Sequence, residues 1–388
     1  MSASDSHSGD NRDEGKLEAS VSSAASGGSE IGNTKVWDQV RQELAQVEEP
    51  QPPTGHFTGK NADATHGSER QEMNWARGYG RYLIVGGIIC GLAIPELASL
   101  FRPFLVPLLI ASLALALLQA DFTQMMTYSA RKMLIGGLLF ILLFLCPVFV
   151  ALEAKLVLVP YGLPLSIADG MILAAMAPPL LATPVIAFLL RLDATLALIV
   201  CLLSHVVAPI SIALLAEWLM GPEISISFGE LVQRLTILIG AGFVLGLGLR
   251  SIGLAKWLNR SPSNTAWIDS LAVINLTLLA IALMDGVTAL GLTDPKFVAL
   301  AFALGFILNP VLQLLGAALF STSGASTSLT VGLLAGYRNT GVLIAVLAGS
   351  ADPRVLTFLA IIQIPTFLMP MISSPILRRI RQLHTASA

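Results

Sequence analysis

The chain is dominated by a succession of apolar segments, each about as long as a membrane is thick. Ten such runs follow one another after residue 76, with short connections between them. A helix of about 20 apolar residues spans the hydrocarbon core of a bilayer. Apolar residues make up 54% of the 388 residues and charged residues only 12%, against about 25% charged residues in a typical soluble protein. The sequence therefore predicts an all-α integral membrane protein.

We expect ten transmembrane helices, each defined by its length and its scarcity of charge. They lie at about 82–100, 103–120, 133–156, 167–190, 196–219, 228–250, 265–287, 297–320, 329–349 and 354–376.

Residues 1–75 have a different composition from the rest of the chain. They carry 13 acidic and 6 basic residues, whereas residues 76–388 carry 12 acidic and 17 basic ones. The first region is rich in Ser, Gly, Asp and Glu and cannot bury enough apolar surface to offset its chain entropy. We expect a disordered acidic N-terminal tail over 1–75 and a membrane domain over 76–388.

Basic residues in the short loops predict the orientation of the spans, because cytoplasmic loops carry an excess of Lys and Arg. One face receives Arg77, Arg81, Arg131, Lys132, Arg191, Arg250, Lys256, Arg260, Arg378, Arg379 and Arg381. The other face receives only Arg102, Lys155, Lys296 and Arg354. The bias predicts a multi-pass protein of the cell (inner or plasma) membrane with both termini in the cytoplasm.

Two segments far apart in the chain resemble each other. The third span contains "LCPVFVALEAKL" (145–156) and the eighth "LNPVLQLLGAAL" (308–319), with six of twelve positions identical. This match divides the membrane domain into two halves of five spans, repeat one at about 80–220 and repeat two at about 226–378. An odd number of spans per half inverts the second half across the membrane, which is the architecture of many secondary transporters.

The fourth and ninth spans contain residues that interrupt helices. Pro178, Pro179 and Pro184 lie within seven residues of the fourth span, and each removes a backbone donor and clashes with the preceding turn. The ninth span reads "LLAGYRNTG" (333–341), in which two glycines permit an unwound turn. Unwound backbone inside a membrane survives only where protein or a watery cavity surrounds it. We therefore expect both breaks to meet at one substrate site.

In the sequence motifs at these two breaks, the membrane region resembles the bile acid:sodium symporter superfamily, and the resemblance covers nearly all of residues 80–378. The resemblance implies ten spans in an inverted repeat, whose fourth and ninth helices break and cross at the substrate and sodium sites. The family's fourth-helix motif, Pro-Gly-Gly-Thr-Ala-Ser-Asn-x-x-Thr, falls on "PPLLATPVIA", so that Thr183 stands at the Ser and Pro184 at the Asn. Its ninth-helix motif, Glu-x-Gly-x-Gln-Asn, falls on "LAGYRN", where Gly336 and Asn339 match.

The departures from these motifs bear on coupling. Leu334 stands where the family has Glu, and Arg338 stands where it has Gln. A fixed guanidinium 4 Å from Na⁺ would repel the ion by about 4 kcal/mol at an effective dielectric near 20. We expect sodium coupling at these positions to be lost or weak. The arsenite-exporter branch of similar fold uses a Cys in the fourth helix, and no Cys lies near Pro178–Pro184.

Arg338 is the charge that the ninth span must accommodate. An arginine at the centre of a spanning helix costs ~2.5–3.5 kcal/mol on insertion scales. Its guanidinium matches a carboxylate or phosphate, so we expect it to face a polar cavity and bind an anionic substrate. The alternative is a structural charge that pairs with an acid or with the carbonyls of the break. The other expected substrate-binding residues are Tyr337, Asn339, Thr340, Thr183, Pro184 and Gln363.

His205 and Asp285 are the candidates for coupling to protons. A histidine titrates near neutral pH, although a lone one is commonly a hydrogen-bonded structural group. For Asp285, which is the weaker candidate, we favour a solvated or capping role at a helix end. Polar residues inside spans also bridge helices by hydrogen bonds, which is the reading we favour for Asn275, Asn309, Gln313 and Gln363, although Gln363 also stands among the expected substrate-binding residues. Cys90, Cys146 and Cys201 have no metal-binding spacing and are expected to be small core residues.

The sequence thus predicts a secondary transporter, not an enzyme, that moves a small or amphipathic organic anion by alternating access. It implies no cofactor beyond Na⁺ or H⁺ as a coupling ion and no metal site. The expected partners are the substrate and membrane lipid, and no basic patch supports nucleic-acid binding. A non-transporting membrane receptor or sensor with the same fold is the alternative function.

Overall fold

Proline, glycine and capping residues set where many helices begin and end. The computed structural model describes residues 75–220, 226–258, 260–369 and 372. The expected disordered tail lies outside these residues, except for Trp75. Within the described part of the chain every regular element is helical, and no β-strand occurs. In chain order, the elements are α4 (Trp75–Ala93), α5 (Pro95–Phe101), η1 (Arg102–Phe104), α6 (Leu105–Gln119), α7 (Phe122–Thr127), η2 (Tyr128–Arg131), α8 (Lys132–Phe140), η3 (Ile141–Leu145), α9 (Cys146–Leu152), η4 (Glu153–Leu158), η5 (Val159–Tyr161), α10 (Leu165–Met176), α11 (Thr183–Leu189), α12 (Ala194–Met220), α13 (Phe228–Ser251), α14 (Leu254–Leu258), α15 (Pro262–Leu283), α16 (Val287–Thr293), α17 (Pro295–Leu319), η7 (Ser321–Ser323), α18 (Ala325–Gly336), α19 (Thr340–Leu347) and α20 (Pro353–Ile361).

Six helical segments are long and apolar enough to cross a membrane. They are Pro95–Gln119, Lys132–Tyr161, Ala194–Met220, Phe228–Ser251, Ser263–Thr293 and Pro295–Leu319. Four shorter apolar segments accompany them, namely Tyr82–Ala93, Leu165–Met176, Ala325–Gly336 and Pro353–Met369. Large apolar side chains such as Val244 and Phe188 are exposed on the outside of this assembly. The chain is therefore an all-α, multi-pass membrane protein.

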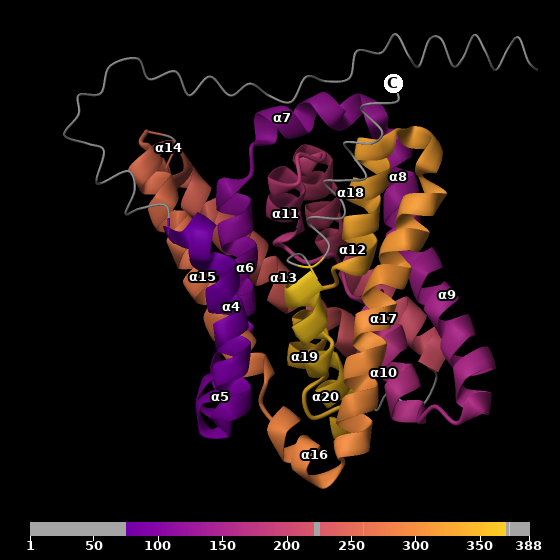
Figure 1. The fold of residues 1–388 in the computed structure, drawn as a ribbon. Coiled ribbons are helices and arrows are strands. Elements are labelled where there is room, and N and C mark those ends of the chain that lie inside the picture. The colour runs from indigo at the N-terminus through magenta and orange to yellow at the C-terminus, as the bar shows by residue number, and fades with distance from the viewer. Residues whose placement is uncertain (1–74, 221–225, 259, 370–371, 373–388) are drawn as a thin grey trace, which may run out of the picture. The chain divides into compact units, whose positions relative to one another are not determined.

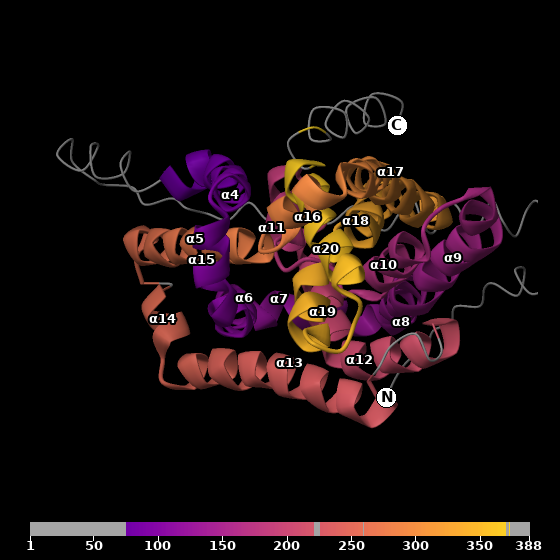
Figure 2. The same ribbon diagram turned by 90° about the horizontal axis from the view of Figure 1, so that it is seen from below.

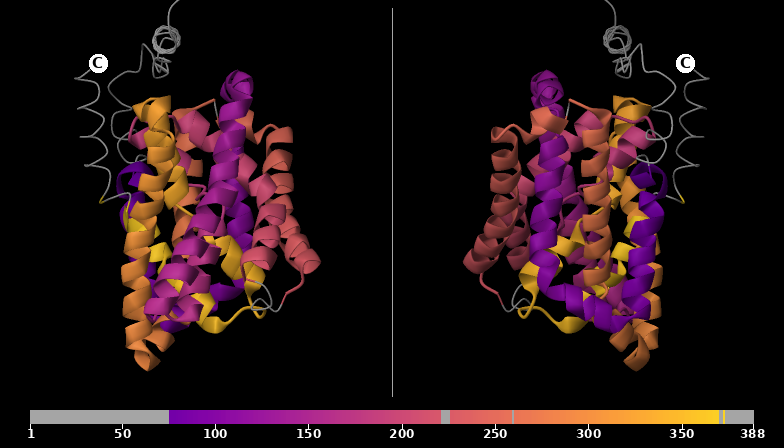
Figure 3. Two further views of the ribbon diagram at one scale, coloured as in Figure 1. Left: turned by 90° about the vertical axis from the view of Figure 1, so that its right-hand side faces the viewer. Right: turned by 90° about the vertical axis from the view of Figure 1, so that its left-hand side faces the viewer.

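Several expected spans are interrupted by residues that oppose a regular helix. The first is divided at Ile94, which leaves the helical conformation with φ of −128° and ψ of 81° because Pro95 follows it. The third contains two π-helical stretches, η3 and η4. The seventh ends at Leu283 and resumes as α16 after Gly286, whose φ of 81° suits glycine. Figure 3 shows that the long helices nevertheless run side by side along one direction.

The structure confirms the two predicted breaks in the fourth and ninth spans. Helix α10 ends at Met176 and α11 begins at Thr183, while α18 ends at Gly336 and α19 begins at Thr340. Figure 1 shows α11 and α18 above the point where the breaks meet and α10 and α19 below it. The C-terminal ends of α10 and α18 therefore approach the same region from opposite directions.

The helix contacts outline two groups, which α13 joins by packing against α12. In one group α4 packs along α15, and α6 packs along α13. The other group holds the broken helices together with α8, α9, α12, α17 and α20. Seen from below, α4, α6 and α15 lie on one side and α8, α9 and α17 on the other, with α19 between them (Figure 2). Residues 167–176 of α10 and 330–336 of α18 are buried without exception, so the breaks lie in the protein interior.

Candidate functional site

The two unwound segments, 177–182 and 337–339, pair with each other in the antiparallel sense; we call this pairing the crossing. The N–H of Leu180 donates to the carbonyl of Tyr337 at 2.8 Å, and the N–H of Asn339 donates to the carbonyl of Pro178 at 2.8 Å. A bridge between Pro179 and Arg338 lies at its centre. Backbone groups that leave a helix inside a membrane must find partners within the protein. Here each break supplies them to the other.

The first break follows from its prolines. Pro178 and Pro179 bring no N–H to continue α10, and Ala177 before them is extended with ψ of 143°. Helix α11 then starts at Thr183 with Pro184 in its first turn, a position where proline is well tolerated.

The second break depends on glycine for a different reason from the one that the sequence suggested. Gly336 ends α18 with ordinary backbone angles, and its φ is not positive. A Cβ on Gly336 would lie 2.3 Å from Cγ of Gln313 and 2.8 Å from the carbonyl oxygen of Asn309. The missing side chain lets α18 approach α17 closely, and the chain turns out of the helix at the next residue.

Arg338 fills the space between the ends of the two broken helices. Only 3% of the residue is exposed. Its Nε donates to the carbonyl of Ala335 at 2.7 Å, and its Nη1 donates to the carbonyls of Leu142 at 3.1 Å and Ala177 at 3.2 Å. Ala335 and Ala177 belong to the C-terminal ends of α18 and α10, where helix dipoles place partial negative charge. The sequence left open two structural partners for this charge, an acidic side chain or the carbonyls of the break. The guanidinium pairs with carbonyls.

The carbonyl of Leu142 is available because of the proline in the repeated motif. Leu142 lies in the π-helical stretch η3, where the N–H of Cys146 donates to the carbonyl of Ile141. Continuing that pattern, residue 147 would donate to Leu142, but Pro147 has no N–H. The freed carbonyl accepts from Arg338 instead, and the thiol of Cys146 lies beside the guanidinium.

Thr340 and Gln363 meet at the start of α19. With its amide oriented to satisfy its neighbours, Gln363 accepts hydrogen bonds from the N–H groups of Thr340 and Gly341, each at 3.1 Å. The Thr340 hydroxyl donates to the carbonyl of Leu359 at 2.9 Å. These bonds join the first turn of α19 to α20 and to the residues that follow it, and Gln363 satisfies N–H groups that have no partner within α19.

The remaining expected substrate residues also surround the crossing. Tyr337 and Asn339 flank Arg338 and are buried, and their backbone groups make the two pairing bonds. Thr183 is fully buried at the start of α11, next to the buried Pro184. The Thr183 hydroxyl has no hydrogen-bond partner among the described residues.

The two coupling candidates occupy different surroundings. His205 is 1% exposed, with Nδ1 at 2.8 Å from the carbonyl of Cys201 and Nε2 without a partner in the described part of the chain. The Cys201 thiol lies 3.5 Å from the carbonyl of Pro179, so this face of α12 reaches the crossing. Asp285 follows the end of α15 and forms an ion pair with Arg102 of η1.

Sequence reasoning missed one signal for the site, which lies in the repeated motif itself. Aligning "LCPV" with "LNPV" makes Cys146 equivalent to Asn309. Cys146 lies beside the guanidinium, and Nδ2 of Asn309 donates to the carbonyl of Gly336 at 3.0 Å. Asn309 bridges α17 and α18, as expected of a polar residue in a span, and Gln313 donates to its side chain. The equivalence of the two positions was the signal that both reach the breaks.

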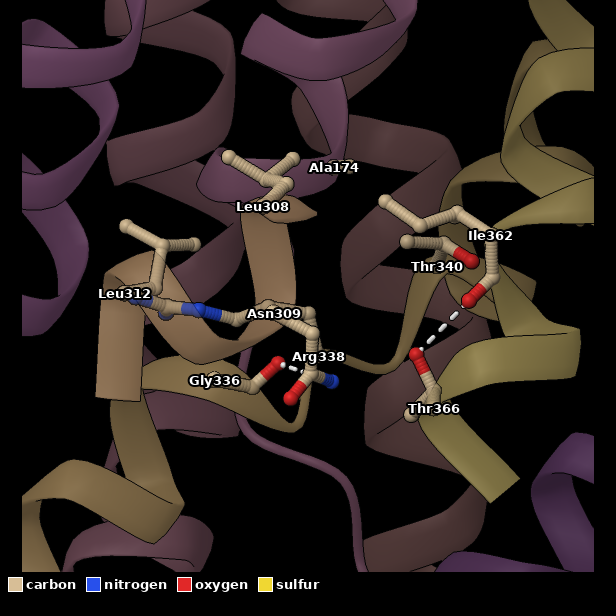
Figure 4. Close-up of a pocket in the computed structure, with 9 residues that line it drawn as sticks. All are labelled: Ala174, Leu308, Asn309, Leu312, Gly336, Arg338, Thr340, Ile362 and Thr366. Carbon is tan, nitrogen blue, oxygen red and sulfur yellow. Dashed lines mark hydrogen bonds between the residues drawn. The ribbon is translucent and has the colours of Figure 1, made fainter. Parts of the chain in front are cut away.

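The cavity beside Arg338 is far smaller than the polar cavity that the sequence led us to expect. Its volume is about 10 Å³, at the limit for one water molecule. Asn309, Arg338, Thr340 and Thr366 contribute its polar lining, and the other lining residues are apolar except for the backbone of Gly336 (Figure 4). The guanidinium is thus enclosed by protein, and an organic anion would need the helices around the crossing to separate.

No protein-family model matches the chain, and no curated protein matches it.

Proposed function

We propose that the protein is a secondary transporter of the bile acid:sodium symporter-like class, which moves a small or amphipathic organic anion by alternating access. The observation that carries the proposal is the crossing, where two interrupted helices pair inside a membrane protein. A continuous helix already satisfies its own backbone. Interrupting two helices at one place exposes polar groups there, which is how many transporters build a site in mid-membrane.

The proposed architecture is ten spans in two inverted repeats. In an inverted repeat of five spans per half, span one corresponds to span six and span two to span seven. A contact between spans one and seven then corresponds to a contact between spans six and two. The contacts follow this correspondence, since α4 packs on α15 and α13 packs on α6. Close approaches at glycines follow it as well: Gly87 of α4 faces Thr277, and Gly246 of α13 faces Leu117. These paired contacts support the repeat that the motifs at 145–156 and 308–319 suggest.

The charge at the crossing favours an anionic substrate. No ion pair among the described residues involves Arg338, and its Nη2 has no hydrogen-bond partner there. This donor carries positive charge in a low-dielectric interior, where a carboxylate or phosphate would bind it strongly. Thr183 supplies a second donor without a partner at the first break.

The same charge disfavours sodium coupling at the crossing. Three carbonyls that could have held a cation already accept hydrogen bonds from Arg338. A sodium ion brought within 4 Å of the guanidinium would meet a repulsion of about 4 kcal/mol at an effective dielectric near 20. Coupling to protons, with His205 or Asp285 as carrier, and transport without a coupling ion are the remaining possibilities within the proposal.

Uptake into proteoliposomes tests the function. The purified full chain is reconstituted and offered a panel of labelled organic anions, with and without gradients of Na⁺ and of pH. We expect saturable uptake of at least one anion that does not require Na⁺. Binding of an anion without flux would favour a receptor or sensor and contradict the transporter.

Two substitutions of arginine sharpen this experiment. Arg338→Ala removes the buried cation, and we expect uptake to fall at least tenfold, as for loss of a charge-assisted contact of about 1.5–3 kcal/mol. Arg260→Ala removes an exposed arginine next to α14 and serves as the matched control. Equal uptake by both variants would remove Arg338 from the site.

A further inference from the structure

We propose that the guanidinium of Arg338 is a built-in cation, held in a binding site that the ends of α10 and α18 form, and that a free guanidinium ion occupies this site when the side chain is removed. The site is defined by hydrogen bonds within this chain and exists whether or not the protein transports. Its consequence for coupling, that transport uses no sodium ion at the crossing, rests on the proposed function.

The first argument is the set of acceptors. Three backbone carbonyls, those of Ala335, Ala177 and Leu142, converge on one guanidinium at 2.7, 3.2 and 3.1 Å. They come from three separate helical segments, so no single helix positions them. Carbonyl oxygens around a common centre, without a carboxylate, form a cation site of modest strength. The guanidinium suits this site because it is planar and carries several N–H donors.

The second argument is electrostatic. The C-terminal ends of α10 and α18 point at the crossing from opposite directions, and each carries partial negative charge. No acidic side chain of the described residues forms an ion pair with Arg338. The positive charge of the guanidinium therefore balances the partial negative charge of two helix ends, and not the charge of an acidic side chain. Without it, three carbonyls in the protein interior would lack their partner.

The third argument is that each acceptor has lost its ordinary partner for a reason visible in the sequence. Pro147 lacks the N–H that would have bonded to Leu142 in the π-helical pattern. Pro178 and Pro179 stop α10, and the chain leaves α18 after Gly336. The prolines and the breaks thus create the acceptors, and Arg338 lies at the centre of the second break to fill them.

The fourth argument is enclosure. Arg338 is 3% exposed, and the Cys146 thiol lies against the guanidinium. Truncating the side chain to Ala frees an enclosed space beside the three carbonyls and this thiol, made up of the room of the guanidinium and of the two methylene groups that link it to Cβ. A free guanidinium ion can take the place of the side-chain guanidinium in charge and donor geometry, whereas choline has no N–H donors.

Thermal unfolding of the purified full chain in detergent tests the proposal. Wild type, Arg338→Ala, Arg338→Met and the control Arg260→Ala are compared in low-millimolar guanidinium chloride and in choline chloride of equal concentration. We expect the melting temperature of Arg338→Ala to lie below that of wild type in choline and to rise saturably with guanidinium. Wild type and Arg260→Ala should not respond, because their site is filled.

Arg338→Met separates charge from volume. Its thioether chain fills much of the space without donating hydrogen bonds, so we expect a low melting temperature that guanidinium does not raise. A methionine variant as stable as wild type, or an alanine variant that guanidinium fails to stabilise, would overturn the proposal. If Arg338→Ala cannot be purified folded in choline, purification in guanidinium must recover it, and failure to do so counts equally against the site.

A flux measurement on the same preparations separates this proposal from the proposed function. Guanidinium stabilisation of Arg338→Ala, without anion uptake by wild type, keeps the cation site and removes the transporter. Uptake by wild type without such stabilisation keeps the transporter and removes the cation site.

Discussion

At the scale of single residues, several basic side chains serve as caps for helix ends. Arg250 donates to the carbonyls of Leu117, Leu118 and Ala120 at the end of α6. Arg234 donates to the carbonyl of Val346 near the end of α19, and Lys155 to that of Leu219 at the end of α12. The last carbonyls of a helix have no partner within it and carry partial negative charge. Arg338 follows the same principle but caps two helices at once, inside the protein.

Tyr128 gives a prediction on pH dependence outside the spans. Its hydroxyl donates to Oδ2 of Asp193 at 2.7 Å. Burial, and then the hydrogen bond and charge of Asp193, raise the pKa of Tyr128 above its ordinary value. The folded chain therefore holds this proton more tightly than the unfolded chain. The resulting stability is present below about pH 10, the ordinary pKa of tyrosine, and is lost as the pH rises further.

Replacing this hydroxyl should change both the stability at a given pH and the slope of stability against pH. We expect Tyr128→Phe to lower the free energy of unfolding by about 1 kcal/mol at pH 8 and to lose less stability than wild type between pH 9 and 11. Thermal unfolding in detergent across this range measures both. Tyr161→Phe is the control, since Tyr161 is 89% exposed. Equal losses in wild type and Tyr128→Phe would contradict the assignment.

At the scale of elements, equivalent prolines of the repeated motif have different effects. Pro147 follows a π-helical stretch and frees the carbonyl that Arg338 uses. Pro310 lies inside α17, which remains α-helical across it. The same four-residue Leu-x-Pro-Val pattern therefore stands next to a π-helical stretch in one half and inside a regular α-helix in the other.

Restoring the missing N–H tests this interpretation. In Pro147→Ala the new N–H closes the helix on the carbonyl of residue 142 or 143 and pulls that turn away from Arg338. We expect the free energy of unfolding to fall by about 1–2 kcal/mol more than in Pro310→Ala, because a hydrogen bond to a charged group is weakened. Chemical or thermal unfolding of the two variants in parallel measures the difference, and a Pro147→Ala variant at least as stable as Pro310→Ala would contradict it.

Glycines on two helices give a matched test of helix packing. A Cβ on Gly87 would lie 2.9 Å from the carbonyl oxygen of Thr277, and one on Gly246 would lie 2.8 Å from Cβ of Leu117. Gly86 and Gly248, on the same helices, have nothing within 4 Å of such an atom. We expect Gly87→Ala and Gly246→Ala to lower stability by about 1–3 kcal/mol.

The neighbouring glycines should respond in the opposite direction. In Gly86→Ala and Gly248→Ala the added methyl group meets open space, and alanine favours a helix over glycine by up to about 1 kcal/mol. Unfolding temperatures of the four variants provide the measurement. A loss in Gly248→Ala as large as in Gly246→Ala would show that helix contact does not govern these positions.

At the scale of the whole membrane domain, the basic loops segregate by end. Helices α7, α11 and α14 adjoin the loops of the basic-rich face, and they lie at the end of the assembly opposite to α5 and α16 (Figure 1). For the described residues, these elements thus lie at the two ends to which the sequence assigned the adjoining loops. The positive-inside rule predicts that the first face is cytoplasmic.

Labelling of single cysteines with a membrane-impermeant maleimide tests this orientation. In a Cys90→Ser background, Arg260→Cys marks the basic-rich face and Leu292→Cys in α16 marks the other; both positions are exposed. In intact cells we expect Leu292→Cys to react and Arg260→Cys to react only after permeabilisation. The reverse pattern would invert the protein and contradict the charge bias.

The sequence by itself determined the membrane class, the position of most helices and the two breaks, because these depend on local properties. Apolar length sets a span, and prolines such as Pro178 and Pro179 stop a helix wherever they occur. It also identified Arg338 as a charge that needed compensation. It left Gln363 between a substrate role and a hydrogen bond that bridges helices, and the structure shows the Gln363 side chain bonded to the first turn of α19.

Only the tertiary structure decided what compensates the charge of Arg338. The acceptors come from residues 142, 177 and 335, and the first of these lies 196 positions away in the chain. Their convergence depends on the packing of three helical segments, and backbone carbonyls leave no mark in the sequence because every residue has one. For the same reason the small cavity could not be foreseen: the space beside a side chain is a property of its neighbours, and it is fixed only when the helices have packed.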